Sequence, residues 1–368
     1  MSDDVDPELT RIVARALPGA RIVRVETLGT DAAAARQQRT AKAAGYGIPI
    51  RIDVELHGKM RALVFHGTSE NAFGHDRRAD RAAELLLAAD TFGAIPGHTR
   101  VLDVGAFRAD GSTVSLSNTG EFYLLTEYAE GTPYADDLRR IAQSGTATAE
   151  DLGRVDALAD YLLTLHTPVE GHAFAYRRAL RDLLGSGEGI FGIIDAYGQG
   201  SSSLDLTPLK HIERRCWEWR WRLKARSPRL RRIHGDFHPF NVLFDGRGEL
   251  HVLDTSRGSL GDAADDVACM AVNFVFFAID DMATWEAALA PLWRRFWDRY
   301  LAGASDDRLL QTVAPFLAWR LLVLACPVWY PNQSAAARRR LLTLAEAALD
   351  AERFEPNLAE KVLKGGGP

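Results

Sequence analysis

The residues best suited to chemistry lie between positions 233 and 254. The segment Ile-His-Gly-Asp-Phe-His-Pro-Phe-Asn-Val-Leu-Phe (233–244) places the carboxylate of Asp236 and the carboxamide of Asn241 five residues apart. The short hairpin expected to follow ends in Val-Leu-Asp, which supplies a second carboxylate, that of Asp254. Phosphoryl transfer uses such a set, because one carboxylate accepts the proton of the attacking hydroxyl while an amide oxygen and a second carboxylate hold Mg²⁺ on the nucleotide phosphates. The order Asp-x₄-Asn, hairpin, Asp is that of the catalytic and metal loops of kinases.

Two other interpretations use the same residues. An ordinary hairpin rich in Asp and Asn would carry them without any chemistry. Alternatively, His234, Asp236 and His238 alternate along the chain, as the ligands of a hydrolytic metal site on one face of a strand would. Pro239 and Asn241 fit the kinase-type loop better, and no distant set of His and Asp completes a zinc site.

The pattern His-Gly-Asp-x-His-x-x-Asn (234–241) resembles the aminoglycoside phosphotransferase and choline kinase group, the small-molecule branch of the protein-kinase-like fold. Three further stretches resemble parts of that group. They are the hinge-like Leu-Leu-Thr-Glu-Tyr-Ala-Glu-Gly (124–131), a helix that ends in Leu-His (158–166), and the Gly-Asp-x-x-x-Asp stretch (261–268). The resemblance extends, in order, over residues 20–270, and the catalytic segment is its most specific part.

The resemblance implies a role for each residue of the motif. The catalytic residues would be Asp236, as the base, and His234, which would brace the loop. Asn241 and Asp254 would bind Mg²⁺. The backbone that hydrogen-bonds to adenine would belong to three hinge residues, Glu127, Tyr128 and Ala129. The cofactors are then Mg²⁺ and ATP or GTP, and the partner is a small molecule that offers a hydroxyl group.

The acidic stretch after the hairpin and the histidine at the helix end have simpler interpretations. Asp262, Asp265 and Asp266 are more typical of capping or loop-bracing groups than of metal ligands, and the resemblance makes Asp265 or Asp266 structural. His166 is more typical of a packing residue at a helix end than of a catalytic one. The glycine pattern 187–192 matches a nucleotide loop in spacing, but it follows the hinge, so it predicts a helix stop and a turn.

The nucleotide-binding half departs from the family pattern. Kinases place a lysine on the third strand, held by a glutamate of the following helix, to bind the α- and β-phosphates. This chain has 44 Lys and Arg together, of which only six are Lys, and the third-strand position after Leu-Val-Phe (63–65) is His66. Glu84 is the expected partner carboxylate, and Gly29 is the one glycine of the first-strand turn. Two sources remain open for the phosphate cradle, namely the Ala-, Arg- and Gln-rich stretch up to Gly47 and the stretch 69–74.

The elements that must position these residues fall into two parts. Alternating apolar and polar residues predict strands at 20–28, 50–56 and 61–66, and shorter apolar runs predict strands at 101–104 and 121–127. A helix is expected over 76–92, and helices are expected over 135–170, 205–227 and most of the chain after 265. The fold class is α+β: a bilobal, protein-kinase-like fold with a small antiparallel sheet and one helix in the first lobe, and a large, mainly helical second lobe. We expect a nucleotide-binding lobe over residues 1–128 and a catalytic and substrate lobe over 129–368.

Composition and net charge limit the classes of binding partner and the cellular compartment that we expect. The net charge of −5 predicts no binding to nucleic acid or to an anionic membrane. Three lone cysteines and an acidic N-terminus without the features of a signal peptide predict a cytoplasmic protein with reduced thiols. The sequence predicts no oligomeric state.

Two functions remain open. The first is transfer of the γ-phosphoryl group to a small-molecule hydroxyl. The second is a kinase-fold binding module that lacks efficient transfer because His66 replaces the lysine. The charge of the acceptor is also open, because Asp280 and Asp281 would suit a cationic acceptor whereas Arg294 and Arg320 would suit an anionic one.

Overall fold

The computed structural model describes residues 6–28, 47, 49–170, 172, 174–197 and 206–365. The chain divides into two compact units, Met1–Thr126 and Glu127–Pro368. We call them the first and the second unit and describe each by itself. The predicted boundary after residue 128 remains a prediction.

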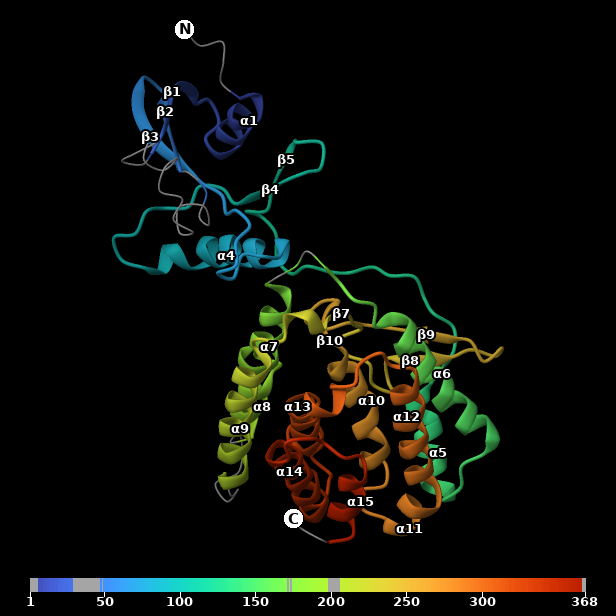
Figure 1. Cartoon of the computed structure of the whole chain (residues 1–368). Helices are drawn as coiled ribbons and strands as arrows, with labels where there is room; N and C mark the ends of the chain where they lie inside the picture. Colours follow the sequence, from blue (N-terminus) through green and yellow to red (C-terminus); the bar gives the residue numbers. More distant parts are fainter. Residues whose placement is uncertain are drawn as a thin grey trace. The chain divides into compact units, whose positions relative to one another are not determined.

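The first unit is built on a three-stranded antiparallel sheet. Strands β1 (Arg21–Thr27), β2 (Ile50–Leu56) and β3 (Lys59–Phe65) lie in the order β1-β2-β3 (Figure 1). The turn between β2 and β3 has positive φ at His57 and Gly58, as the tightest hairpins require. Ile52 and Val54 of the central strand are buried, which is the alternation that the sequence pattern predicts. The three strand predictions for this sheet are therefore confirmed.

A helix that the sequence analysis missed covers this sheet. Helix α1 (Pro7–Ala16) begins after Asp6, whose side chain accepts a hydrogen bond from the Glu8 N–H, and has Pro at its first position. Leu9 and Val13, one turn apart, pack with Ile52 and Val54. The expectation of one helix in this part is wrong, because helix α4 (Arg78–Thr91) is present as well.

The remaining strand predictions of the first unit also need correction. Residues 101–104 are not a strand; the strands lie just beyond, as the hairpin of β4 (Gly105–Phe107) and β5 (Thr113–Ser115). Residues 121–127 have no regular structure and pair with no strand among the described residues. A short 3₁₀ turn, η1 (Phe92–Ala94), follows α4.

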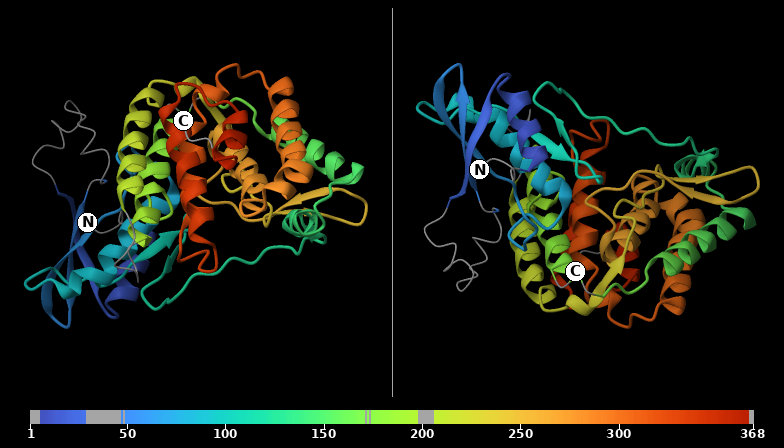
Figure 2. Two further views of the ribbon diagram at one scale, coloured as in Figure 1. Left: turned by 90° about the horizontal axis from the view of Figure 1, so that it is seen from below. Right: turned by 90° about the horizontal axis from the view of Figure 1, so that it is seen from above.

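The second unit is mainly helical, as predicted. Its elements are β6 (Thr132–Pro133), α5 (Tyr134–Ser144), α6 (Ala149–Leu165), α7 (Ala175–Gly185), α8 (Ile190–Ala196), α9 (Thr207–Leu223), η2 (Ser227–Arg229), β7 (Leu230–Arg232), β8 (Val242–Phe244), β9 (Leu250–Val252), β10 (Leu260–Asp262), α10 (Ala263–Phe276), α11 (Met282–Thr284), η3 (Trp285–Leu289), α12 (Ala290–Gly303), η4 (Leu309–Gln311), α13 (Ala314–Ala325), α14 (Ala335–Asp350) and α15 (Asn357–Leu363). Helices α7, α8 and α9 lie on one side of this unit and α5 and α6 on the other, with α10, α12, α13 and α14 between them (Figures 1 and 2).

Two small antiparallel sheets hold the segment that carries the predicted chemistry. The predicted hairpin is present as β8 and β9, and β6 pairs with β8. Strands β7 and β10 pair with each other, so residues 233–241 form a loop between β7 and β8. Directly after β10, helix α10 begins, and every residue from 263 to 275 of this helix is buried. The β7–β10 pair therefore connects the loop to a helix that is buried along nearly its whole length.

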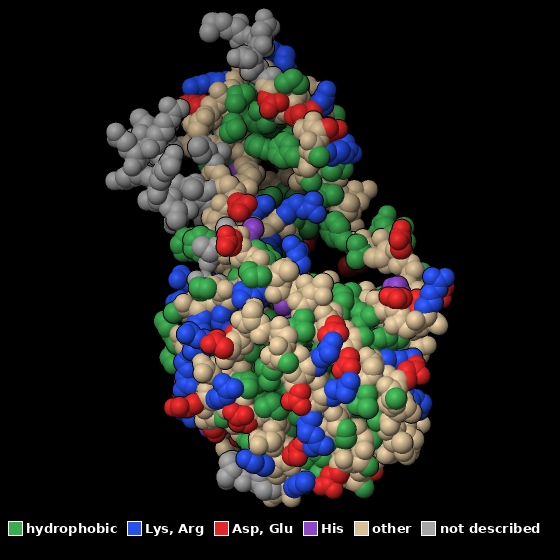
Figure 3. Space-filling view, turned by 45° about the vertical axis from the view of Figure 1, so that its right-hand side comes forward, with side chains coloured by type: hydrophobic (Ala, Val, Ile, Leu, Met, Phe, Trp, Pro, Cys, Tyr) green, Lys and Arg blue, Asp and Glu red, His purple; other side chains and the backbone are tan. Residues whose placement is uncertain are grey.

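The surface of the second unit mixes charges of both signs. Acidic and basic side chains are interspersed on the face that Figure 3 shows. Between α12 and α6, for example, Arg295 pairs with Asp156 and Arg299 pairs with Asp160. No helix among the described residues combines the length and the apolar character needed to cross a membrane.

The first half of the glycine pattern 187–192 forms the predicted stop and turn after a helix, and residues 190–192 are the first turn of the next helix, α8. Helix α7 ends at Gly185, and Gly189 precedes the first residue of α8. A Cβ on Gly192 would lie 2.0 Å from the carbonyl oxygen of Gly187, so the close approach of the two backbones requires glycine. The turn is held to α13 by Trp319, whose Nε1 donates to the Glu188 carbonyl at 2.8 Å.

Candidate active site

The loop between β7 and β8 (233–241), which the sequence analysis predicts to be catalytic and which we call the catalytic loop, is held in place by one buried carboxylate. Asp266 accepts hydrogen bonds from the backbone N–H groups of His234 (2.7 Å) and Gly235 (2.8 Å), and its Oδ2 lies 3.1 Å from His166 Nε2. Burial would raise the pKa of the Asp266 carboxyl, but the hydrogen bonds from His166 and from the loop outweigh it, and the pKa is lowered. Gly235 has φ of +86°, and a Cβ there would lie 2.6 Å from the Ser256 carbonyl oxygen. The sharp turn that presents Asp236 therefore requires glycine.

His166 and the acidic stretch after the hairpin hold structure, as the sequence analysis expects. His166 ends α6, and its Nδ1 lies 2.6 Å from the Tyr300 hydroxyl. Asp262 caps α10 by accepting from the Ala264 N–H, and its carboxylate also accepts from Nε and Nη2 of Arg229. Asp265 pairs with Arg257 at 2.7 Å. None of these groups contacts Asn241 or Asp254 among the described residues.

His234 braces the loop from inside. Its Nδ1 accepts a hydrogen bond from the backbone N–H of Asp236 at 3.2 Å, so the ring proton belongs on Nε2. The ring packs edge-on against Phe237, with centroids 5.8 Å apart, and Phe237 stacks on Tyr161 of α6. The contact with Asp236 is through its backbone N–H, so His234 holds the shape of the loop.

Asp236 lies among three polar partners. Its Oδ1 accepts from Arg320 Nη1 at 2.6 Å, and its Oδ2 lies 3.4 Å from His238 Nε2 and 3.3 Å from Asn241 Nδ2. Burial would raise the pKa of this carboxyl, but the His238 hydrogen bond and the Arg320 charge hold it well below its usual range. The side chain is 23% exposed, so an ionised carboxylate faces solvent at the centre of the loop.

Asn241 and Asp254 form the other end of the site. The Asn241 Nδ2 points at the Asp236 carbonyl (3.2 Å) and the Asp254 carbonyl (3.4 Å), and the Asn241 carbonyl accepts from the Leu253 N–H. Asp254 has a positive φ of 26° and is exposed. Within the described part of the chain, no hydrogen bond engages the Asn241 Oδ1 or the Asp254 carboxylate. Two hard oxygens remain available, which fits the donor set that Mg²⁺ prefers.

No three His, Cys, Asp or Glu side chains of the described residues gather into a metal-binding cluster. The alternative hydrolase site of His234, Asp236 and His238 is therefore not assembled, because the His234 ring faces the interior of the loop. The kinase-type set needs only Asn241 and Asp254, since water and phosphate oxygens complete the coordination of Mg²⁺.

The residues predicted to contact nucleotide are placed as follows. His66 lies just beyond β3 and is exposed. Glu84 lies on α4, where its carboxylate is 2.9 Å from His75 Nε2, and the other nitrogen of His75 is 2.8 Å from Asn71 Nδ2. The structure thus places Glu84 against His75 instead of the expected His66. Gly29 lies outside the described residues. The hinge residues Glu127, Tyr128 and Ala129 begin the second unit in a segment without regular structure.

Of the residues weighed for the acceptor, only Arg320 contacts the catalytic loop. Asp281 caps α11 by accepting from the Ala283 and Thr284 N–H groups, and Asp280 accepts from the Ser334 hydroxyl. Arg294 pairs with Glu360. The sequence signal for Arg320 is its isolation, because it is the one charged residue of the otherwise apolar helix α13.

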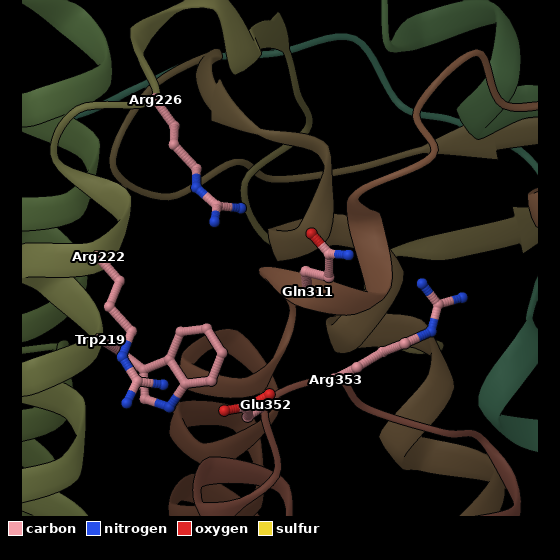
Figure 4. A pocket seen from close by; sticks show the side chains of 6 residues that line it. All are labelled: Trp219, Arg222, Arg226, Gln311, Glu352 and Arg353. Atoms are coloured by element: carbon pink, nitrogen blue, oxygen red, sulfur yellow. The ribbon is translucent and has the colours of Figure 1, made fainter.

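A separate basic cavity of about 340 Å³ lies elsewhere in the second unit (Figure 4). Its lining side chains come from the end of α9, from the segment between α9 and η2, from η4 and from the segment after α14, namely Trp219, Arg222, Arg226, Gln311, Glu352 and Arg353. The guanidinium of Arg222 stacks 4.9 Å from the Trp219 ring. The catalytic loop contributes no side chain to this cavity.

Comparison with known proteins identifies the family to which this chain belongs. A family model described as a phosphotransferase enzyme family matches residues 71–316, about two thirds of the chain. No curated protein matches significantly. Among solved structures, a choline kinase from Streptococcus pneumoniae is similar at 13% identity, with 93% of this chain and 97% of that chain covered and a TM-score of 0.34. A choline/ethanolamine kinase family protein from Mesorhizobium loti is similar at 14% identity, with 97% and 99% covered and a TM-score of 0.35. A glucosamine kinase is similar at 15% identity, with 89% and 92% covered and a TM-score of 0.37.

Proposed function

Because this chain belongs to the phosphotransferase enzyme family, we propose that it transfers the γ-phosphoryl group of Mg²⁺-bound ATP or GTP to a hydroxyl group of a small molecule. The observation that carries the proposal is the arrangement of Asp236, Asn241 and Asp254. The first is an ionised, partly exposed carboxylate, and the other two offer hard oxygens on the adjoining hairpin.

In the proposed reaction, Asp236 accepts a hydrogen bond from the acceptor hydroxyl and takes its proton as the bond to phosphorus forms. The lowered pKa of Asp236 keeps the carboxylate ionised near neutral pH, so it is ready to orient the hydroxyl. Its low basicity makes orientation the larger part of its contribution, with proton transfer late in the step. His234 and Asp266 hold the loop so that this carboxylate keeps its position.

Asn241 and Asp254 would hold Mg²⁺, which when bound neutralises charge on the nucleotide phosphates. The Asn241 amide is already fixed, because its Nδ2 contacts the Asp236 and Asp254 carbonyls and leaves Oδ1 for the metal. The backbone of Glu127, Tyr128 and Ala129 would hold the adenine base. His66, Glu84 and Gly29 remain proposed contributors to phosphate binding.

The test is a nucleotide and acceptor screen on the intact protein. We expect ATP or GTP to raise the melting temperature only when Mg²⁺ is present, and a set of amino alcohols, sugars and aminoglycosides to reveal nucleotide turnover. Asp254→Asn should weaken the Mg²⁺-dependent shift, whereas Asp156→Asn, a surface carboxylate paired with Arg295, should not. Absence of any metal-dependent shift with either nucleotide would contradict the proposal.

A second candidate function is a binding module without efficient transfer. It is favoured by two observations: His66 is exposed, and Glu84 lies against His75 and not against a third-strand lysine. This candidate predicts a Mg²⁺-dependent shift with nucleotide but no transfer to any acceptor. Replacement of His66 by Lys would then raise nucleotide affinity. If His66→Lys leaves both affinity and turnover unchanged, the absence of the lysine is not what limits the protein.

A further inference from the structure

Arg320 is a buried cation that points at the catalytic carboxylate. It lies on α13 and is 8% exposed. Its Nη1 donates to Asp236 Oδ1 at 2.6 Å and its Nη2 donates to the Gly235 carbonyl at 3.0 Å. Its Nη2 also lies 3.5 Å from Asp265 Oδ1. One residue of a distant helix therefore contacts both the turn glycine of the catalytic loop and the side chain that the glycine presents.

Aromatic and charged groups around Arg320 stabilise its guanidinium in this position. The guanidinium lies 3.6 Å from the centre of the Trp319 ring, and Arg257 lies 3.9 Å from the same ring. Arg257 also donates to the Gly235 carbonyl and pairs with Asp265. A lone arginine in an apolar helix is costly to bury unless its charge is paired. The pairing with Asp236 and Asp265 meets that requirement.

We propose that Arg320 is a positioning residue for phosphoryl transfer, which holds Oδ1 of Asp236 so that Oδ2 is the oxygen offered to the acceptor hydroxyl. The proposal rests on the proposed role of Asp236. The family match ends at residue 316, before Arg320, so the match assigns this residue no role. With Oδ1 fixed by Arg320, the carboxylate cannot rotate freely, and Oδ2 stays on the side of His238 and Asn241.

A structural role alone predicts a different result from a positioning role. Loss of a structural contact lowers the amount or stability of folded protein, while the folded fraction keeps its turnover number. Loss of a positioning contact lowers kcat at nearly constant KM, because a carboxylate displaced by about 1 Å can cost about 100-fold in rate.

The test compares Arg320→Lys and Arg320→Met with wild type, with kinetics expressed per folded protein. Lysine keeps the positive charge but cannot donate to Asp236 and to the Gly235 carbonyl from two separate nitrogens. We therefore expect kcat to fall about 10-fold in Arg320→Lys and about 100-fold in Arg320→Met. The KM values for nucleotide and acceptor should stay within about 3-fold of wild type. Arg299→Met, which removes an exposed arginine paired with Asp160, is the matched control and should keep wild-type kcat. A kcat within twofold of wild type in folded Arg320→Lys and Arg320→Met would overturn the proposal, as would a loss confined to KM.

A second measurement separates this proposal from the proposed function. A double-mutant cycle in urea unfolding uses Asp236→Asn, Arg320→Met and the double variant, and it needs no activity. We expect the effects on the unfolding equilibrium constant to be non-additive by about 10-fold. Additivity within twofold would refute the contact even in an active enzyme. A wild-type protein without turnover would refute the proposed function and with it the role toward the acceptor, while the cycle would still decide the contact.

Discussion

Asp266→Asn is the sharpest test of how the catalytic loop is held. The wild-type carboxylate is fully buried and accepts from three donors: the His234 N–H and His166 at Oδ2, and the Gly235 N–H at Oδ1. An amide has one oxygen and one NH₂ group. If the amide oxygen takes the position of Oδ2, the NH₂ group takes the position of Oδ1 and faces the Gly235 N–H. Both groups are hydrogen-bond donors, so the Gly235 N–H loses its acceptor.

The cost can be worked from these contacts. One hydrogen bond to a charged group is lost outright, which amounts to about 1.5–3 kcal/mol. The other two lose the charge of their acceptor, so each weakens by up to about 1 kcal/mol, since charge-assisted bonds are roughly twice as strong as neutral ones. We therefore expect the free energy of unfolding of the second unit to fall by about 1.5–5 kcal/mol.

The assay is urea unfolding followed by tryptophan fluorescence. All eight tryptophans of the chain lie beyond residue 216, so this signal reports on the second unit. Asp160→Asn is the control, because this exposed carboxylate pairs with Arg299 and should change stability by less than about 1 kcal/mol. If Asp266→Asn unfolds at the same urea concentration as Asp160→Asn, Asp266 does not hold the loop in the way described.

Three further predictions use the same unit. Gly235→Ala should destabilise it by about 2–4 kcal/mol in urea unfolding, because φ is +86° and the new Cβ would meet the Ser256 carbonyl; an effect below about 0.5 kcal/mol would show that the turn can relax. The pKa of Asp262 is lowered because Arg229 outweighs its burial, so its stabilisation is present above the unfolded pKa of about 3.9 and is lost as the pH falls through the lower folded value. The free energy of unfolding should therefore decline on acidification below the unfolded pKa, and this decline should be shallower in Arg229→Met. If urea unfolding gives the same dependence of stability on pH in Arg229→Met as in wild type, this linkage is excluded. Removal of Mg²⁺ with EDTA should abolish the thermal shift caused by nucleotide in wild type, and a shift that survives EDTA would place nucleotide binding on groups other than Asn241 and Asp254.

The catalytic loop and its hairpin are predictable from the sequence because their residues are close along the chain. Asp236 and Asn241 belong to one loop, and the two short apolar runs Val-Leu-Phe (242–244) and Leu-His-Val (250–252), separated by a glycine-containing turn, indicate the hairpin locally. The first three strands of the chain follow from the same kind of local pattern. Asp262 and Asp266 are recognisable as capping or bracing groups because they stand at the start of a long apolar helix.

Two kinds of feature cannot be predicted from the local sequence: side-chain contacts between residues far apart along the chain, and the failure of a strand-like segment to find a pairing strand. Arg320 lies 84 residues from Asp236, and His166 lies 100 residues from Asp266. No local pattern around Arg320 indicates Asp236 as its partner, and none around His166 indicates Asp266. Residues 121–127 have the composition of a strand, but a strand forms only when another pairs with it, and among the described residues none does. Helix α1, by contrast, carries a local signal that the sequence analysis missed, because Leu9, Ile12 and Val13 recur at helical spacing directly after Asp6 and Pro7.

The central claim, that Asp236 with Asn241 and Asp254 forms a phosphoryl-transfer site, is tested most directly by ³¹P NMR of the reaction products. Wild-type protein is incubated with Mg²⁺, nucleotide and the acceptor that gives the most turnover in the screen, beside Asp236→Asn under the same conditions. We predict a phosphate ester of the acceptor in the wild-type sample and a rate about 100- to 10,000-fold lower in Asp236→Asn, with nucleotide affinity unchanged. An equal rate of ester formation in Asp236→Asn would contradict the claim.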